Sequence, residues 1–132
     1  MNIVEILIIR NDKYQIAKLL CNSKTLTINF VMKDEYSKTY SGTNFYDCFG
    51  HIRKEHRNIV FLCKGAKINV HPSSMSSQMS LGVKAYELTI GKYASMNYVV
   101  NIFDYEENNL TNDPEVQREF FMRWVESDIS EE

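Results

Sequence analysis

The stretch that decides the fold class is residues 25–57, TLTINFVMKDEYSKTYSGTNFYDCFGHIRKEHR, because its hydrophobic period changes halfway along. Over residues 25–32 apolar and polar side chains alternate, which is the period of a half-buried strand. Beyond Ser41 and Gly42, apolar residues recur at helical spacing and predict a helix over residues 43–57. Its apolar stripe is formed by Phe45, Cys48, Phe49 and Ile52.

The face of the 43–57 helix opposite this stripe is basic. His51 and His56 lie five residues apart on it, a spacing that does not match the HExxH metal motif. We therefore expect a solvated helix face, with these side chains in water: His51, Arg53, Lys54, His56 and Arg57. Cys48 on the stripe and Cys63 in an apolar run are expected to be small core residues.

Apolar runs outside this stretch predict further strands, at residues 3–9, 59–63, 85–90 and 98–103. Near the end of the chain, Asp113 as N-cap and Pro114 at the first helical position begin a helix. Its predicted apolar face consists of Val116, Phe120, Phe121, Trp124 and Val125. Because the elements do not follow a regular βαβ alternation, the sequence predicts one α+β domain over residues 1–132. We expect a single, mostly antiparallel sheet covered by helices, among them a central helix and a C-terminal amphipathic helix.

Two segments fit more than one structure. In residues 12–21, Asp12 as a helix cap favours a short helix, although the alternation over residues 14–20 also fits a strand. In the serine-rich segment after the first proline, Met75 and Met79 lie one helical turn apart. This spacing suits a short helix or an ordered loop. The two methionines fit an adaptable binding surface, but core packing is the more common role of such a pair and is what we expect.

Length and composition limit the possible classes of function. The chain has 132 residues, of which 44% are hydrophobic, so it can bury the core of one domain. Three cysteines without a CxxC pair, and an apolar start without a basic leader, predict a soluble cytoplasmic protein. No run reaches the roughly 18 apolar residues of a membrane span, so no membrane contact is expected.

Charge is distributed unevenly along the chain. Residues 1–103 hold thirteen basic and seven acidic side chains, whereas residues 104–132 hold two and ten, with a formal net charge of −2 overall. The overall balance excludes a histone-like protein that binds nucleic acid through bulk charge. The asymmetry instead indicates a charged partner and electrostatic steering of association.

The acidic residues after residue 103 surround a tyrosine and a polar turn, EENNLTND, that is expected to be a surface loop. A carboxylate-rich loop with an aromatic anchor is suited to a basic protein surface, although acidic loops also serve solubility alone. The candidate contact residues are Asp104, Tyr105, Glu106, Glu107 and Asp113. The segment that holds His71 and Met75 is a second candidate surface.

An enzyme is one alternative function. Its best candidate residue is His71, which precedes a run of hydroxyl side chains. The chain contains no GxSxG elbow and no glycine-rich phosphate loop, so we expect no catalytic residues, no cofactor and no metal. The residues that could assist the histidine are Ser73, Ser74 and Lys84.

A nucleic-acid module is a second alternative, with Arg53, Lys54 and Arg57 as its phosphate contacts. Such a module needs exposed aromatic residues on the same face. Because Phe45 and Phe49 lie on the opposite, core-facing side of the predicted helix, we expect no nucleic-acid binding.

Several segments resemble a small bacterial family of about this length. They are SGTNFYDC at 41–48, GAK at 65–67, VHPSSM at 70–75, GVKAY at 82–86, VNIFD at 100–104 and PEVQREFFMRW at 114–124. Two positions depart from the family pattern: Ser74 stands where it has glycine, and Lys64 where it has asparagine.

This family is similar to the immunity proteins of polymorphic toxin systems, including contact-dependent growth inhibition. The resemblance implies a non-enzymatic protein that binds and neutralises a cognate toxin domain. Nuclease toxins are common in such systems and are often basic. It also gives the acidic loop an expected role, which is to occupy the positive substrate groove of the toxin. The oligomeric state is left open by the sequence.

Overall fold

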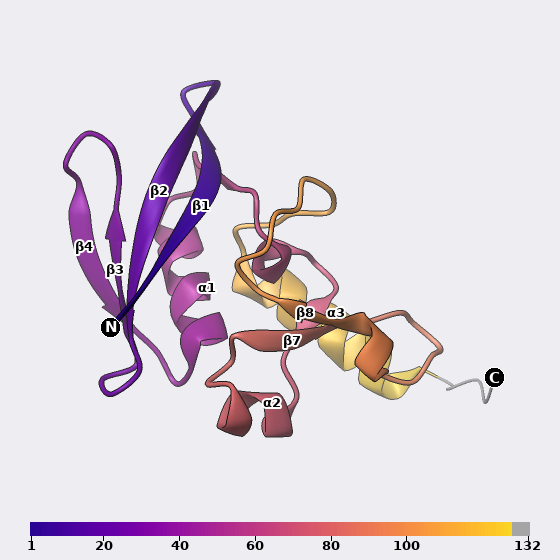
Figure 1. The fold of residues 1–132 in the computed structure, drawn as a ribbon. Helices are drawn as coiled ribbons and strands as arrows, with labels where there is room; N and C mark the ends of the chain where they lie inside the picture. The colour runs from indigo at the N-terminus through magenta and orange to yellow at the C-terminus, as the bar shows by residue number, and fades with distance from the viewer. Residues whose placement is uncertain (128–132) are drawn as a thin grey trace.

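The computed structural model describes residues 1–127 and contains two antiparallel sheets and three α-helices (Figure 1). The first sheet has the order β4-β3-β2-β1-β5 and the second the order β6-β7-β8. The strands of the first sheet are β1 (Asn2–Arg10), β2 (Lys13–Asn22), β3 (Thr27–Val31), β4 (Ser37–Ser41) and β5 (Val60–Phe61). Those of the second are β6 (Val70–His71), β7 (Lys84–Glu87) and β8 (Val99–Asn101). The predicted α+β class is confirmed, with the difference that the strands form two sheets.

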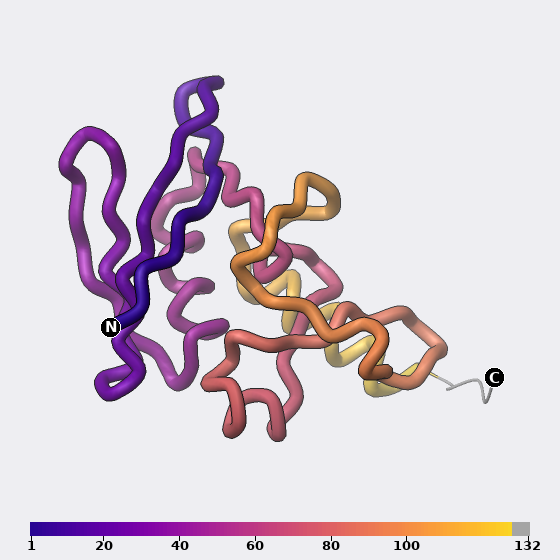
Figure 2. Tube along the Cα trace, in the orientation of Figure 1, coloured from indigo at the N-terminus to yellow at the C-terminus, as the bar shows by residue number. Residues whose placement is uncertain are grey.

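Helices form at two of the predicted places, within residues 43–57 and from Pro114, and the serine-rich segment forms a short helix. They are α1 (Phe45–Glu55), α2 (Ser74–Met79) and α3 (Pro114–Glu126), with short 3-10 helices η1 (Lys64–Ala66) and η2 (Met96–Tyr98). The trace in Figure 2 shows that the first sheet and α1 occupy one half of the molecule and that later elements occupy the other half. No helix in the described part of the chain is long and apolar enough to span a membrane.

The helix expected over residues 12–21 is wrong, because this segment forms β2. Asn11 and Asp12 have φ angles of 54° and 60°, and Arg10 pairs directly with Lys13 across them. Positive φ at both central residues defines a two-residue type I′ hairpin turn, a conformation that asparagine and aspartate tolerate well. Asp12 is therefore a turn residue and not a helix cap. The alternation along this segment is that of a strand with one buried face, at Ala17, Leu19 and Cys21.

Helix α1 packs against the first sheet through the predicted stripe. Phe45, Cys48, Phe49 and Ile52 are all buried. The Asn44 side chain caps the helix by accepting a hydrogen bond from the backbone N–H of Asp47 at 2.7 Å. The three cysteines are buried free thiols, as expected for Cys48 and Cys63, and burial raises the pKa of Cys63 to about 12.

The basic helix face is predicted incorrectly at two positions. Arg53 is fully buried between α1 and α3, and His56, which caps the C-terminus of α1, lies half-buried against Phe30. The His56 Nε2 atom is 2.9 Å from the Tyr40 hydroxyl and 3.2 Å from the Tyr36 hydroxyl. His51, Lys54 and Arg57 are exposed as expected.

Three predicted strands are shorter than expected, because only part of each run pairs with a neighbouring strand. The 59–63 run pairs only over β5, and the next residues enter η1. There Gly65 lies against Ile102, close enough that an added Cβ would be 2.7 Å from the Ile102 Cβ. Only glycine permits this close approach, which packs η1 directly against the residue that follows β8. One continuous core of buried residues accordingly extends from the first sheet to Val70, Ala85, Ile102 and Phe103.

Candidate functional site

The acidic loop is an ordered extension of the folded core. From Asp104 to Thr111 the backbone lies alongside the segment that contains η1, with isolated antiparallel bridges between Cys63 and Tyr105 and between Lys67 and Leu110. Four backbone hydrogen bonds join the two segments: Lys64 N–H to Asp104 at 2.8 Å, Glu106 N–H to Leu62 at 3.2 Å, Ile68 N–H to Asn109 at 2.8 Å and Thr111 N–H to Ala66 at 2.8 Å. Because both edges of the loop are tied in this way, its conformation is fixed before any partner arrives.

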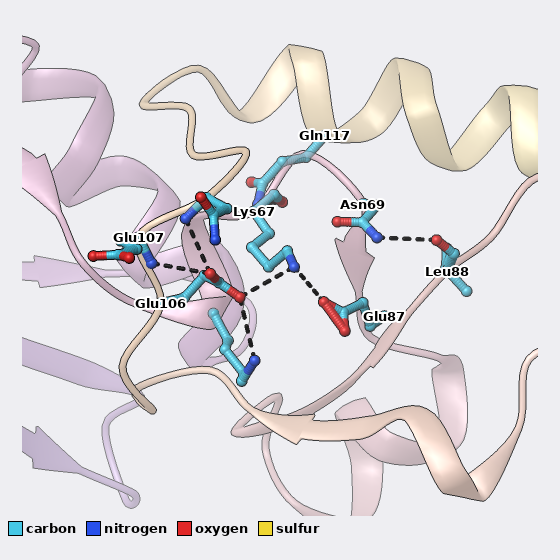
Figure 3. Close-up of polar contacts among 9 residues, drawn as sticks. Lys67, Asn69, Glu87, Leu88, Glu106, Glu107 and Gln117 are labelled. Carbon is cyan, nitrogen blue, oxygen red and sulfur yellow. Dashed lines mark hydrogen bonds and ion pairs between the residues drawn. The ribbon is translucent and has the colours of Figure 1, made fainter.

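Glu106 anchors the loop from inside. Its Oε1 atom lies 3.3 Å from Lys64 Nζ and 3.1 Å from Lys67 Nζ, and its side chain is only 12% exposed. Its Oε2 atom accepts hydrogen bonds from the backbone N–H groups of Glu107 and Asn108, each at 3.0 Å (Figure 3). The Asn108 N–H and the two lysines lower the pKa of Glu106 to about 2. We conclude that this carboxylate is ionised and committed to the loop, so that little of it remains to contact a partner.

Lys67 continues this network into the second sheet. Its ammonium lies between Glu106 and Glu87 of β7, and it donates hydrogen bonds to both carboxylates (Figure 3). Burial alone would lower the pKa of Lys67, but the two carboxylates outweigh it and raise the pKa above its usual value. One lysine therefore joins the acidic loop to β7.

Tyr105 and Glu107 flank this anchor and point to solvent. Tyr105 is 54% exposed, and its hydroxyl donates a hydrogen bond to Glu107 Oε2 at 2.8 Å. The neighbouring Glu107 carboxylate raises the pKa of Tyr105. Asp104 and Glu107 are also exposed. This group of three residues, Asp104, Tyr105 and Glu107, is called the loop tip below. Within the predicted acidic surface, these three residues are the ones whose side chains the structure leaves exposed.

Asp113 has a structural role at the end of the loop. Its Oδ1 atom accepts a hydrogen bond from the backbone N–H of Glu115 at 3.0 Å, so it caps α3 as predicted. The preceding Asn112 donates hydrogen bonds from its amide to the His56 and Ile59 carbonyls at 3.1 and 2.6 Å. The start of α3 is thus fixed against the end of α1.

A buried polar pair holds α3 in place. Arg53 donates from Nη2 to Gln117 Oε1 at 2.6 Å and from Nε to the Thr111 carbonyl at 3.2 Å. Gln117 in turn donates to the Gly65 and Lys67 carbonyls, each at 2.8 Å. The guanidinium lies over the Phe49 ring at 4.8 Å, and burial lowers the pKa of Arg53 to about 10. Because Arg53 is buried, it is not available to contact phosphate, and only two of the three basic residues proposed for a nucleic-acid module, Lys54 and Arg57, are exposed.

His71 lies under α3 and away from the hydroxyl groups proposed to assist it. Its ring stacks on Phe121 with 4.0 Å between centroids, and its Nδ1 atom is 2.8 Å from the Pro72 carbonyl oxygen. Burial lowers the pKa of His71. Within residues 1–127 no hydrogen bond joins it to Ser73, Ser74 or Lys84, so the groups of the enzyme hypothesis are not brought together. Ser73 instead caps α2 through a hydrogen bond from the Ser76 N–H at 3.0 Å.

Met75 and Met79 do not pack into the core, which corrects the prediction. They are 68% and 81% exposed on α2, because this short helix buries no residue completely. With Tyr86, Met96 and Val99 they line a mostly apolar groove of about 210 Å³. Figure 1 shows α2 at the opposite end of the second half of the molecule from the loop at residues 104–109. The seven predicted contact residues therefore belong to separate regions.

Sequence reasoning missed the residues that position the loop tip. Gln117 is the one with a recognisable signal, because it is a polar residue inside the predicted apolar face of α3. A polar residue at such a position indicates a buried hydrogen-bonding partner. Lys64, Lys67 and Glu87 carry no comparable signal, since lysine and glutamate are ordinarily surface residues.

Within the described residues no group of three or more His, Cys, Asp or Glu side chains is arranged to hold a metal ion. A search with protein-family models found no match for this chain, and a search of curated proteins found none either.

Proposed function

We propose that this chain is a cytoplasmic immunity protein that binds a cognate toxin domain and neutralises it without catalysis. The observation that carries the proposal is the construction of the acidic loop. The largely buried carboxylate of Glu106 fixes the backbone, while an aromatic and two acidic side chains are exposed to solvent. An aromatic anchor on a rigid element contributes binding energy without a large cost in ordering the chain.

The charge of the loop tip supports a basic partner. Asp104 and Glu107 are exposed acids, and neither has an ion-pair partner within residues 1–127. Exposed carboxylates of this kind accelerate association with a positive surface. The resemblance to immunity proteins of polymorphic toxin systems makes the substrate groove of a nuclease toxin the natural positive surface. The loop tip is then a direct competitor for the nucleic-acid phosphates.

The experiment is growth of cells that express the toxic domain encoded beside this gene, with and without this protein, together with co-purification of the two. We expect rescue of growth and a stoichiometric complex. Failure of rescue, or rescue without a complex, would contradict neutralisation by binding.

Variants of the loop tip then test the surface. We expect the double change Tyr105→Ala with Glu107→Lys to abolish rescue and to slow association at least about tenfold at low salt. The matched control is Glu119→Lys, the same change of charge at an exposed position of α3, which should leave rescue intact. Equal rescue by both variants would remove the loop tip from the proposal.

A further inference from the structure

Among residues 1–127, no helix covers one of the two faces of the first sheet. Ile6 and Ile8 of β1 and Ala17 and Leu19 of β2 point into the core against α1. Since side chains alternate along a strand, their neighbours point to the opposite face. Figure 1 shows α1 on one side of this sheet and no other described helix against its far side.

Large apolar side chains lie on this uncovered face. Ile3 is 62% exposed and Ile16 52% exposed, and Tyr14 is exposed as well. The β1–β2 register places the outward residues in four rows across the two strands: Ile3 with Leu20, Glu5 with Lys18, Leu7 with Ile16 and Ile9 with Tyr14. Three of the four rows are apolar, and large exposed apolar side chains gathered on one face mark an interaction site.

The remaining row carries one charge of each sign. Glu5 and Lys18 are directly opposite one another and both are exposed, yet within residues 1–127 neither takes part in an ion pair. They line an open hollow of about 590 Å³ together with Ile16 of β2 and Val31 of β3. The face therefore presents an unpaired acid and an unpaired base side by side in an apolar surrounding.

We propose that this face binds a second copy of the chain, sheet against sheet, around a two-fold axis that runs parallel to the strands between β1 and β2. Rotation by 180° about this axis leaves each row at the same position along the strands and places β1 of the second copy over β2 of the first. Glu5 then meets Lys18 of the second copy, Leu7 meets Ile16, and Ile3 meets Leu20. A self-complementary patch of this kind is the requirement for an isologous dimer.

The size of the face suits a stable dimer. β1 and β2 pair over nine residues, which is about 30 Å of strand, and the five strands of the sheet span roughly 24 Å. Because β3 and β4 have only five residues each and β5 has two, the footprint is on the order of 500 Å² per copy, or about 1,000 Å² for both copies, the total area that a specific interface needs to reach. Two twisted sheets that pack face to face lie about 10 Å apart, a distance that glutamate and lysine side chains can bridge.

The test separates contacts between chains from contacts within one chain. Sedimentation of the full chain at micromolar concentration, without any toxin, should give twice the monomer mass of 15.5 kDa. Glu5→Lys alone and Lys18→Glu alone place like charges against each other in a homodimer, so each should weaken self-association at least about tenfold. A 1:1 mixture of the two variants restores opposite charges across the interface and should restore the dimer mass.

Thermal unfolding by circular dichroism checks that each variant is folded, and Ile16→Glu gives an independent disruption of the same face. Glu119→Lys and Lys24→Glu serve as controls for charge, since both residues are exposed and lie outside this face. A monomeric wild-type chain overturns the proposal. Single variants that dimerise like the wild type, or a mixture that stays monomeric, overturn it equally. None of these outcomes depends on toxin binding.

Discussion

Helices α1 and α3 follow from the same kind of apolar stripe in the sequence, yet they are held in the molecule by different forces. α1 buries four apolar residues of its stripe against the first sheet. In α3 the completely buried residue is Gln117, while Phe120, Phe121 and Trp124 are half-buried and Val125 is exposed. α1 is thus fixed by apolar packing, and α3 by a buried polar pair with partial stacking around it. A periodic stripe predicts that a helix forms, but not how deeply it packs.

The largest expected effect is on the apolar side of this comparison. Phe49→Ala removes a ring that contacts Phe61, Phe103 and the Arg53 guanidinium. We expect the free energy of unfolding to fall by about 3–5 kcal/mol, as for other large core truncations. Chemical denaturation measures it, and a loss below about 1 kcal/mol would show that α1 is not held mainly by packing.

A smaller loss of stability, confined to α3, is expected when the buried polar pair is broken. Gln117→Leu leaves Arg53 Nη2 and the Gly65 and Lys67 carbonyls without their partner. We expect a loss of about 2–3 kcal/mol, because a buried hydrogen bond to a charged group is broken and the guanidinium stays buried. Hydrogen exchange should show faster exchange in α3 while the amides of β1 and β2 keep their protection. Uniform acceleration over both sheets would contradict the separation of the two forces.

The double change Arg53→Met with Gln117→Met sharpens this result. Removing both partners leaves no buried charge, so the double variant should be more stable than the sum of the two single changes predicts. Denaturation of the two single variants and the double variant completes the cycle. Additive losses would mean that Arg53 and Gln117 do not act as a pair.

The acid stability of the molecule depends on the anchor of the loop. The pKa of Glu106 in the folded state is lowered to about 2, below its ordinary value of 4.5. The stabilising contribution of Glu106 is therefore complete above the pKa that this carboxyl has in the unfolded chain. It is lost as the pH falls from about 5 toward 2, the pKa in the folded state. Glu106→Gln should flatten the dependence of the free energy of unfolding on pH in this window. An unchanged slope would contradict the role of the ion pairs with Lys64 and Lys67.

The smallest effect concerns the start of α3. Asp113→Ala removes the cap from the Glu115 N–H and should cost about 1 kcal/mol. Amide exchange in the first turn of α3 should rise, whereas exchange in α1, which Asn44 caps, should not change. Equal changes in both helices would indicate that Asp113 acts on the whole fold.

Local sequence signals were sufficient for much of the fold. Caps, periodicity and β-branched runs predicted α1, α3, β1 and β3, because these elements are decided by neighbours in sequence. They failed for residues 12–21, where pairing with β1 decides the structure and the paired positive φ angles of Asn11 and Asp12 make the turn. They also failed for Arg53, since its partner Gln117 is distant in sequence and joins it only in the folded chain.

The candidate site was predictable only in part. The cluster of acids around Tyr105 is evident in the sequence, and Tyr105 and Glu107 are indeed exposed. Glu106 looks the same as Glu107 in the sequence, yet contact with Lys64 and Lys67 turns it inward. Which of two adjacent glutamates faces solvent depends on residues about 40 positions earlier in the chain, and spacing does not encode that choice.

The most direct test of the proposed function is hydrogen exchange of this protein, free and in complex with the toxin domain encoded beside its gene. Binding through the loop tip predicts that the additional protection is centred on the amides of residues 104–108, with little change at α2. Protection centred on α2 and its methionine groove, with residues 104–108 exchanging as in the free protein, would contradict the account.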